Sequence, residues 1–432
     1  MRALVSVRLG ADFSKLLTAS AVANLGDGVT MVAGPLLVST LTTDPAAVAG
    51  AVFAQQVPWL LFALVSGAWA DRLDRRRLVV AVNVVRALAI ALLTASIALG
   101  FVSVPLIYGV FFVLGAGETL ADTASSAFVP TIVAERHLPV ANSLLGGTFT
   151  VVHQFAAKPF GAWLFALAAA LPFGVNAASF LASALLIAWL RTVPPPARVE
   201  RRPLSEDIRA GLRFLWGHRL LRSLAVTMAF GNLVFCAAFA IFVLYARSVL
   251  GLSSFGYGLL LTAFAVGGLL GTALAPWLLR TAGATALLRV GLLIEVGLHA
   301  TLAATTDPWL AAVAIVVFSI HGAVWATVVV TIRQRTVPPS MYGRATGVYA
   351  FLDLGGAALG SLLGGLLAQA YGLLATFWTA AAAMTVLTAA AWHPLGTATN
   401  ALHPSTPEPT DPPEPTDPPA PRPSTSIGPP EG

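Results

Sequence analysis

Ionisable side chains stand inside long apolar runs of this sequence, where they could bind a substrate or carry a proton. The candidates are Asp27, Glu118, His153, Lys158, His321 and Asp353. A charge inside a membrane-spanning segment costs a few kcal/mol, so it needs either a partner or a function. A carboxyl group in surroundings of low dielectric favours its protonated form and can exchange a proton near neutral pH. These residues therefore predict proton transfer or ion binding within a membrane.

The main candidates for proton coupling are Asp27 and Glu118. Glu118 and Asp122 are four residues apart in one apolar run, so they share a helix face. Glu118 has no evident cationic neighbour at its depth, and we predict that it acts with Asp27 in proton coupling. Simple polar packing would explain both residues equally well. Asp122 lies nearer one end of its run, where Arg86 or Arg75 could pair with it and stabilise one conformation.

Lys158 is a cation within an apolar run, and His153 lies five residues before it. Such a lysine could bind an anionic group of a substrate, or it could neutralise Asp27 or Glu118. An internal ion pair of purely structural value is an equal alternative. Asp353 could complete a cavity cluster with Lys158.

Three further pairs of polar residues are each four apart, so each pair shares one helix face. These pairs are Glu295 with His299, His321 with Trp325, and Asn232 with Cys236. We predict a structural hydrogen bond between Glu295 and His299. The other two pairs could touch a substrate, although hydrogen bonds that pack helices together are the simpler interpretation.

The amino-acid composition indicates which kind of secondary structure holds these side chains. Of 432 residues, 57% are hydrophobic and 10% are charged, whereas a soluble globular protein has roughly 25% charged residues. Apolar runs of the roughly 20 residues needed to cross a bilayer recur along the whole chain, without the alternation of barrel strands. The sequence therefore excludes a soluble protein and predicts a helical membrane protein.

We predict an all-α membrane fold of twelve transmembrane helices in two six-helix bundles. The expected spans are 15–41, 47–70, 78–100, 105–129, 141–166, 171–190, 221–247, 255–279, 287–305, 308–331, 343–368 and 373–392. The expected domains are an N-terminal bundle (1–191), a cytoplasmic linker with a surface helix (192–220), a C-terminal bundle (221–393) and a Pro-rich, disordered cytoplasmic tail (394–432).

Basic residues fix the expected orientation. All of the 25 Lys and Arg except Lys158 and Arg247 fall on the side of the linker, and such residues face the cytoplasm. We therefore expect a multi-pass protein of the cell membrane with both termini cytoplasmic. The formal net charge of +6 belongs to these loops and predicts no nucleic-acid partner. The single cysteine, Cys236, allows no disulfide, and we expect no metal site and no cofactor.

One loop carries a known signature. Residues 67–77 read GAWADRLDRRR, which resembles the major facilitator superfamily motif G-x-L-A-D-R-x-G-R-K between helices two and three. Gly67 would allow close helix approach, and Asp71 can accept from backbone amides or arginines. The resemblance implies a cytoplasmic gating motif. Its residues would be Gly67, Asp71, Arg72 and Arg75, together with Arg86 and Asp122.

Other stretches resemble the drug:proton antiporter branch that includes macrolide and siderophore exporters. They include NLGDGVTMVAGPLL, LGAGETLADTASSAFVPTIV and RQRTVPPSMYGRATGVY. The resemblance implies two bundles that rock about a central cavity lined by helices one, four, seven and ten. Helix five departs from the branch, because residues 157–162 (AKPFGA) keep only Gly161 of the expected G-P-x-x-G-G bend. Pro159 can still bend this helix.

These features predict a secondary transporter that exports small amphipathic compounds, drugs or secreted metabolites, by alternating access in exchange for protons. The alternative is an importer or facilitator of an anionic small metabolite, which Lys158 favours. An integral-membrane enzyme is disfavoured because the external loops are short and the internal ones lack a His/Asp/Glu constellation. No phosphate-binding loop is present for ATP. The expected partners are a small-molecule substrate, protons and the bilayer, and we expect a monomer.

Overall fold

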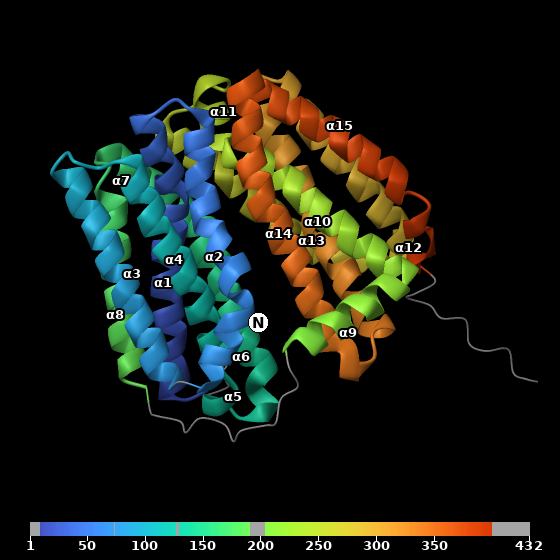
Figure 1. The fold of residues 1–432 in the computed structure, drawn as a ribbon, viewed down its shortest axis with the longest axis horizontal. Helices are drawn as coiled ribbons and strands as arrows, with labels where there is room; N and C mark the ends of the chain where they lie inside the picture. The colour runs from blue at the N-terminus through green and yellow to red at the C-terminus, as the bar shows by residue number, and fades with distance from the viewer. Residues whose placement is uncertain (1–8, 73, 127–128, 191–203, 400–432) are drawn as a thin grey trace, which may run out of the picture.

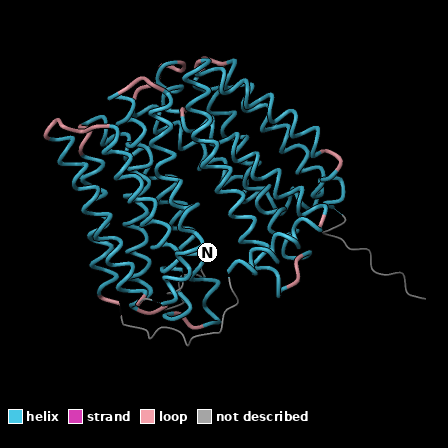
Figure 2. Tube along the Cα trace, viewed as in Figure 1, coloured by secondary structure: helices cyan, strands magenta, loops and turns pink. Residues whose placement is uncertain are grey.

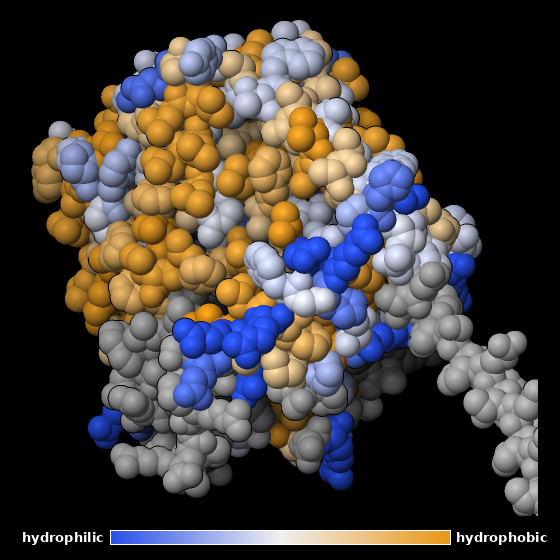
Figure 3. Space-filling model, turned by 45° about the vertical axis from the view of Figure 1, so that its right-hand side comes forward, coloured by the Kyte–Doolittle hydropathy of each residue, from blue (hydrophilic) through white to orange (hydrophobic). Residues whose placement is uncertain are grey.

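A computed structural model describes residues 9–72, 74–126, 129–190 and 204–399, and this part of the chain consists of helices joined by short loops, without strands (Figures 1 and 2). Ten of its helices are long and apolar enough to cross a membrane. Many large apolar side chains lie exposed on them, and Figure 3 shows such side chains over much of the visible surface. A bilayer is the solvent that suits this surface. The predicted all-α membrane fold is confirmed.

The helices before the linker follow the predicted spans closely. They are α1 (Ala11–Leu41), α2 (Pro45–Arg72), α3 (Arg75–Ala98), α4 (Val104–Ser126), α5 (Val129–Ile132), the 3₁₀ turn η2 (Glu135–His137), α6 (Leu138–Thr148), the π-helix η3 (Phe149–Ala156), α7 (Ala157–Leu167) and α8 (Leu171–Ala188). The predicted span 141–166 is thus α6, η3 and α7 in succession. The hydropathy pattern did not indicate the π-helix in the middle of this span.

The helices after the linker begin with α9 (Leu204–Gly217), the predicted surface helix, on which Ile208 and Leu212 are exposed and Leu215 is buried. Then follow α10 (Arg219–Ala240), α11 (Phe242–Ser248), α12 (Ser254–Ala304), α13 (Pro308–Thr336), α14 (Pro339–Tyr371), α15 (Leu373–Ala391) and the 3₁₀ turn η4 (Pro394–Thr397).

The 51 residues of α12 cover two predicted spans, 255–279 and 287–305. The chain breaks between them at Gly283, whose φ of 75° is left-handed and favours glycine. We call the two pieces α12a, before Gly283, and α12b, after it. Because ten helices qualify as spans, the count of twelve stays a prediction.

The helices form two groups that lean against each other (Figure 1). We call the end at which α8 finishes and α9 begins the linker end, and the opposite end the far end. At the far end Gly365 of α14 packs on Ala49 of α2, and Gly258 of α12a packs on Ala162 of α7. A side chain on either glycine would collide with its neighbour. From these contacts the two groups diverge toward the linker end (Figure 1).

Basic side chains at the linker end hold the last helix of each group. Arg76 of α3 donates to the carbonyl oxygens of Ala188 and Leu190, at 3.3 and 2.9 Å. Arg289 of α12b donates to the carbonyl oxygen of Trp392 at 2.7 and 3.0 Å, with its guanidinium 4.8 Å from the Trp392 ring. A cation at a helix C-terminus is favourable because carbonyl groups there have no helical partners. The third helix of each group therefore anchors the end of the sixth.

The ordered chain extends beyond residue 393, where the sequence predicts that disorder begins. Residues 394–399 include η4, and the Leu395 and Ala398 side chains are fully buried. The Thr399 hydroxyl accepts from the backbone amide of Thr285 at 3.0 Å. The boundary was wrong because Pro-rich composition does not reveal that these residues pack on the start of α12b. The rest of the predicted tail, 400–432, lies outside the described residues.

Candidate functional site

Two adjoining polar cavities lie within the first group of helices. Their volumes are about 210 and 310 Å³. Both are lined by Ser20, Asn24, Asp27, Asp122 and Leu145. Arg86 lines only the smaller cavity, whereas Glu118 and His153 line only the larger. The structure thus brings together predicted site residues from α1, α3, α4 and η3.

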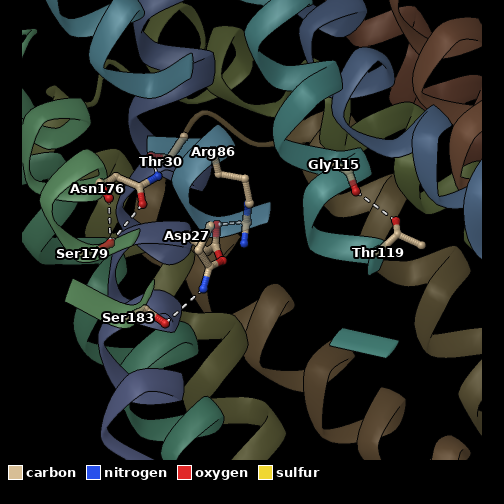
Figure 4. A network of polar contacts seen from close by, with 9 residues as sticks. Asp27, Thr30, Arg86, Gly115, Thr119, Asn176, Ser179 and Ser183 are labelled. Carbon is tan, nitrogen blue, oxygen red and sulfur yellow. Dashed lines mark hydrogen bonds and ion pairs between the residues drawn. The ribbon is translucent and has the colours of Figure 1, made fainter. Parts of the chain in front are cut away.

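An ion pair between Arg86 and Asp27 is the centre of this site (Figure 4). The Arg86 Nη2 donates to Asp27 Oδ1 at 2.7 Å, and the two side chains are 3% and 16% exposed. The guanidinium also lies 4.0 Å from the centre of the Phe180 ring. Gly117 makes room for Arg86, since a Cβ there would approach the Arg86 side chain to 2.7 Å. The interaction is strong because both groups are largely shielded from water.

This pair corrects two predictions. Either Arg86 or Arg75 was expected to pair with Asp122, and of these Arg86 forms its hydrogen bond with Asp27 instead. Glu118 was expected to lack a cationic neighbour, yet Arg86 is close enough to attract its carboxylate. Helix position gives the depth of a side chain but not the direction in which a long arginine turns. Arg86 therefore belongs with the proton-coupling candidates.

Three carboxyl groups, those of Asp27, Glu118 and Asp122, line the two cavities, and Arg86 is the arginine that lines one of them. Glu118 is half-buried, and Asp122 is exposed to the space of both cavities. Asp27 repels the carboxylates of both. If all three acids are ionised, the cluster carries more negative charge than Arg86 compensates. Such a cluster favours the uptake of a proton or of a cationic group.

A layer of hydrogen bonds fixes α1, α3 and α8 around the ion pair (Figure 4). Asn176 donates to the hydroxyl of Thr30 at 2.6 Å, and the Ser179 hydroxyl donates to the Asn176 carbonyl at 2.8 Å. Asn83 donates to the hydroxyl of Ser183 at 3.2 Å. Sequence reasoning missed these residues, although the spacing of three and four between the α8 residues places them on one helix face.

His153 projects from the π-helix and lines the larger cavity. Its ring stacks on Phe149, with centroids 4.7 Å apart and an angle of 11° between the planes. Phe149 lines the same cavity. Gly28 lets α1 approach the His153 backbone, because a Cβ there would lie 2.8 Å from the carbonyl oxygen. π-Helical segments are rare and frequently occur at functional sites.

Lys158 is buried at 3% exposure, and its ammonium donates to Gln154 Oε1 at 2.8 Å. Among the described residues it forms no ion pair, so the expected neutralisation of Asp27 or Glu118 does not occur in this conformation. It does not pair with Asp353 either. Asp353 lies beside α10, where its backbone carbonyl accepts from Asn232 at 3.0 Å.

His321 lies in the second group, where its Nε2 contacts Glu295 Oε1 at 3.2 Å. This contact overturns the predicted hydrogen bond between Glu295 and His299, because the Glu295 carboxylate turns toward α13 instead. Spacing along one helix permits such a bond but cannot exclude a better partner on a neighbouring helix. Hydrogen bonds between helices, the simpler interpretation of the other two pairs, are present for His321 and for Asn232 but not for the Trp325 Nε1 within the described residues. Within the pairs, the His321 and Trp325 ring centroids are 5.6 Å apart, and Cys236 Sγ lies 3.5 Å from Asn232 Oδ1.

The loop motif is only partly described. Gly67, Asp71 and Arg72 fall at the end of α2, where the side chains lie outside the described residues. Asp74 caps α3 by accepting from the Arg77 amide at 3.1 Å, and Arg75 is the first residue of that helix. A gating role for this motif therefore stays a prediction.

The sequence profile of a family in the major facilitator superfamily, described as transmembrane secretion effectors, matches residues 8–413. The chain belongs to this family. The multidrug efflux pump Tap of Mycolicibacterium fortuitum is 30% identical over 84% of this chain and 90% of Tap. The enterobactin exporter EntS of Shigella boydii serotype 18 is 27% identical over 70% of this chain and 72% of EntS. The transporter is therefore no enzyme, as predicted.

A solved structure agrees on the fold. A bacterial homologue of the iron transporter ferroportin in its inward-facing state has a TM-score of 0.72, with 17% identity over 89% of this transporter and 98% of that chain. The outward-facing state of such a homologue has a TM-score of 0.58, with 19% identity over 90% and 100% of the two chains. The major facilitator fold is thus confirmed.

Gly161 offers a test of how this fold holds the site. A Cβ at this position would lie 2.8 Å from the Val29 carbonyl oxygen, so α7 contacts the α1 backbone directly. Gly161→Ala is expected to force the two helices apart and lower the free energy of unfolding by about 1–3 kcal/mol. Gly147→Ala is the matched control, because no atom lies within 4 Å of its Cβ position. Equal thermal unfolding temperatures for the two purified variants would contradict the packing argument.

Proposed function

We propose that the transporter exports small amphipathic compounds in exchange for protons. The observation that carries this proposal is the cluster of Asp27, Glu118 and Asp122 around the buried Arg86. The named activities of the relatives Tap and EntS, multidrug efflux and enterobactin export, support the outward direction. Drugs or secreted metabolites are the proposed substrate class.

The cluster supplies a simple basis for exchange. Excess negative charge at low dielectric is relieved either by protonation of a carboxyl group or by a bound cationic group. The two events compete, since each removes the charge that favours the other. Protons that enter from outside therefore release the substrate, and substrate that binds from the cytoplasm releases protons. This competition is the minimal requirement for antiport.

The proposed orientation places the linker end and both termini in the cytoplasm of the cell membrane, because the basic residues gather there. In this orientation the structure is the state that opens inward, consistent with the divergence of the helix groups toward the linker end (Figure 1) and with the higher TM-score against an inward-facing relative. Opening outward would separate Gly365 from Ala49 and Gly258 from Ala162. We further propose that the transporter works as a monomer.

Everted membrane vesicles test this function. Vesicles that contain the transporter should accumulate the amphipathic dye ethidium when energised, and a protonophore should abolish this accumulation. Asp27→Asn should reduce accumulation to the level of vesicles without transporter, because the variant removes the partner of Arg86. Glu206→Gln, at an exposed acid of α9, is the control that should retain activity. Ethidium accumulation that is unchanged by the protonophore would exclude proton coupling.

A facilitator of anionic metabolites is the second candidate, because Lys158 is a buried cation with a neutral partner. Lys158→Ala is expected to slow dye export more than Arg247→Ala does, since it removes a buried hydrogen bond, but to leave the protonophore effect intact. Uptake of labelled anionic solutes should be absent in both variants and in wild type. If wild type equilibrates such solutes without a gradient and Lys158→Ala does not, the facilitator function replaces export.

A further inference from the structure

A further cavity, mostly apolar, lies in the other group of helices, away from the Arg86 cluster. Its volume is about 140 Å³, and it lies between α10, α12b and α13. The residues that matter here are Gly231, Phe235, Glu295, Phe318, His321 and Trp325. Among the described lining residues, Glu295 is the acid and His321 is its ionisable neighbour.

The Glu295 carboxylate has one oxygen available to this cavity. Its Oε1 contacts His321 Nε2 at 3.2 Å. Its Oε2 lies 3.3 Å from the position that a Cβ on Gly231 would occupy. Because Gly231 has no side chain, that oxygen faces space that belongs to the cavity. A carboxylate accepts several hydrogen bonds, so this one can take a further donor.

The Trp325 indole provides an independent sign of a ligand. Trp325 is 7% exposed, and within the described part of the chain its Nε1 has no hydrogen-bond partner. Burying a donor without a partner costs free energy, and the π face of a bound aromatic ring can accept such an N–H. Trp325 also lines the cavity, and its ring meets His321 edge to face.

Aromatic rings form the apolar wall. Phe235 and Phe318 stack with centroids 5.1 Å apart, and both line the cavity. Such faces attract cations as well as other rings. The size suits a single ring, since an engineered cavity of about 150 Å³ binds benzene.

We propose that this cavity is a substrate subsite for an aromatic ring that bears a protonated amine. The ammonium group would donate to Glu295 Oε2, and the ring would lie against Phe235 and Phe318. The subsite rests on the proposed exchange function and adds to it a place in the second group of helices that recognises the substrate, apart from the carboxyl cluster at which protons and substrate compete. Arg86 lies on the third helix of the first group, and Glu295 lies on the corresponding helix of the second.

Binding of benzylamine to the purified full-length transporter in nanodiscs tests the proposal, with saturation-transfer NMR as the readout. Wild type should bind benzylamine at least about tenfold more tightly than its neutral analogue benzyl alcohol, as a charge-assisted hydrogen bond implies. Glu295→Gln should remove this preference. Empty nanodiscs correct for partition into lipid.

A second variant keeps the test valid if Glu295→Gln does not fold. Gly231→Ala would place a methyl group 3.3 Å from Glu295 Oε2 and should also weaken benzylamine binding at least about tenfold. Gly297→Ala, on α12b with no atom within 4 Å of its Cβ position, should bind like wild type. The binding measurement uses no proton gradient, so loss of this subsite is measured separately from loss of proton coupling. Equal binding of benzylamine and benzyl alcohol by wild type, or unchanged benzylamine binding by Gly231→Ala, would overturn the proposal.

Discussion

Replacing Arg86 with methionine is expected to abolish transport and to destabilise the folded protein by about 3–5 kcal/mol, the usual cost of removing one partner of a buried ion pair. In the wild-type protein Arg86 Nη2 lies 2.7 Å from Asp27 Oδ1. The substitution would leave the Asp27 carboxylate in the same shielded site without this partner. The contact of the guanidinium with Phe180 would be lost as well. The yield of monodisperse protein and its thermal unfolding temperature measure the effect.

A double variant separates charge from packing. Asp27→Asn with Arg86→Met removes both charges, so stability should return largely to the wild-type value, while transport should remain absent. Arg77→Met, at an exposed arginine of the same helix, is the control and should be near wild type in both assays. If Arg86→Met alone were as stable as this control, the ion pair would not be the structural centre of the site.

Replacing Glu118 with glutamine is expected to leave the protein folded but to reduce proton-coupled transport to background. Glutamine keeps the size and hydrogen-bonding capacity of the side chain, and the other two carboxyl groups remain. The variant cannot exchange a proton at this position, which the proposed competition requires. Ethidium accumulation in everted vesicles measures the loss.

Substrate exchange in the absence of a pH gradient provides the control for Glu118→Gln. This reaction needs the alternating conformations but no net proton movement, so the variant should still exchange external for internal ethidium. Loss of both activities would indicate a structural role for Glu118, and retention of both would remove it from the coupling site.

Much of the fold could be predicted from the sequence, because hydropathy is a strong signal in a membrane. Helix α3 begins at Arg75 and α15 ends at Ala391, within a few residues of the predicted bounds. The break at Gly283 falls between the predicted spans 255–279 and 287–305, whereas the π-helix was not predicted. A π-helix is a local backbone change within apolar sequence, and apolar composition does not distinguish one helical hydrogen-bonding pattern from another.

The sequence predicted which candidate residues lie near one another better than it predicted the contacts between their side chains. Asp27 and Glu118 lie around the same pair of cavities, as the depth of their helices suggested. Arg86 pairs with Asp27 and not with Asp122, for which the sequence suggested either Arg86 or Arg75. Pairing between helices depends on how each helix is rotated about its axis, and a single sequence does not contain that rotation. The Glu295 contact with His321 was missed for the same reason. Asn176 and Ser183 were overlooked because uncharged polar residues are common in membrane helices.

Proton movement driven by substrate alone tests the central claim most directly. The purified transporter would be reconstituted into liposomes that hold a pH-sensitive dye, with the membrane potential clamped and no initial pH gradient. A gradient of ethidium should then drive protons in the opposite direction with wild type and produce no proton signal with Glu118→Gln. Movement of ethidium through the wild-type transporter without any proton signal would contradict the account.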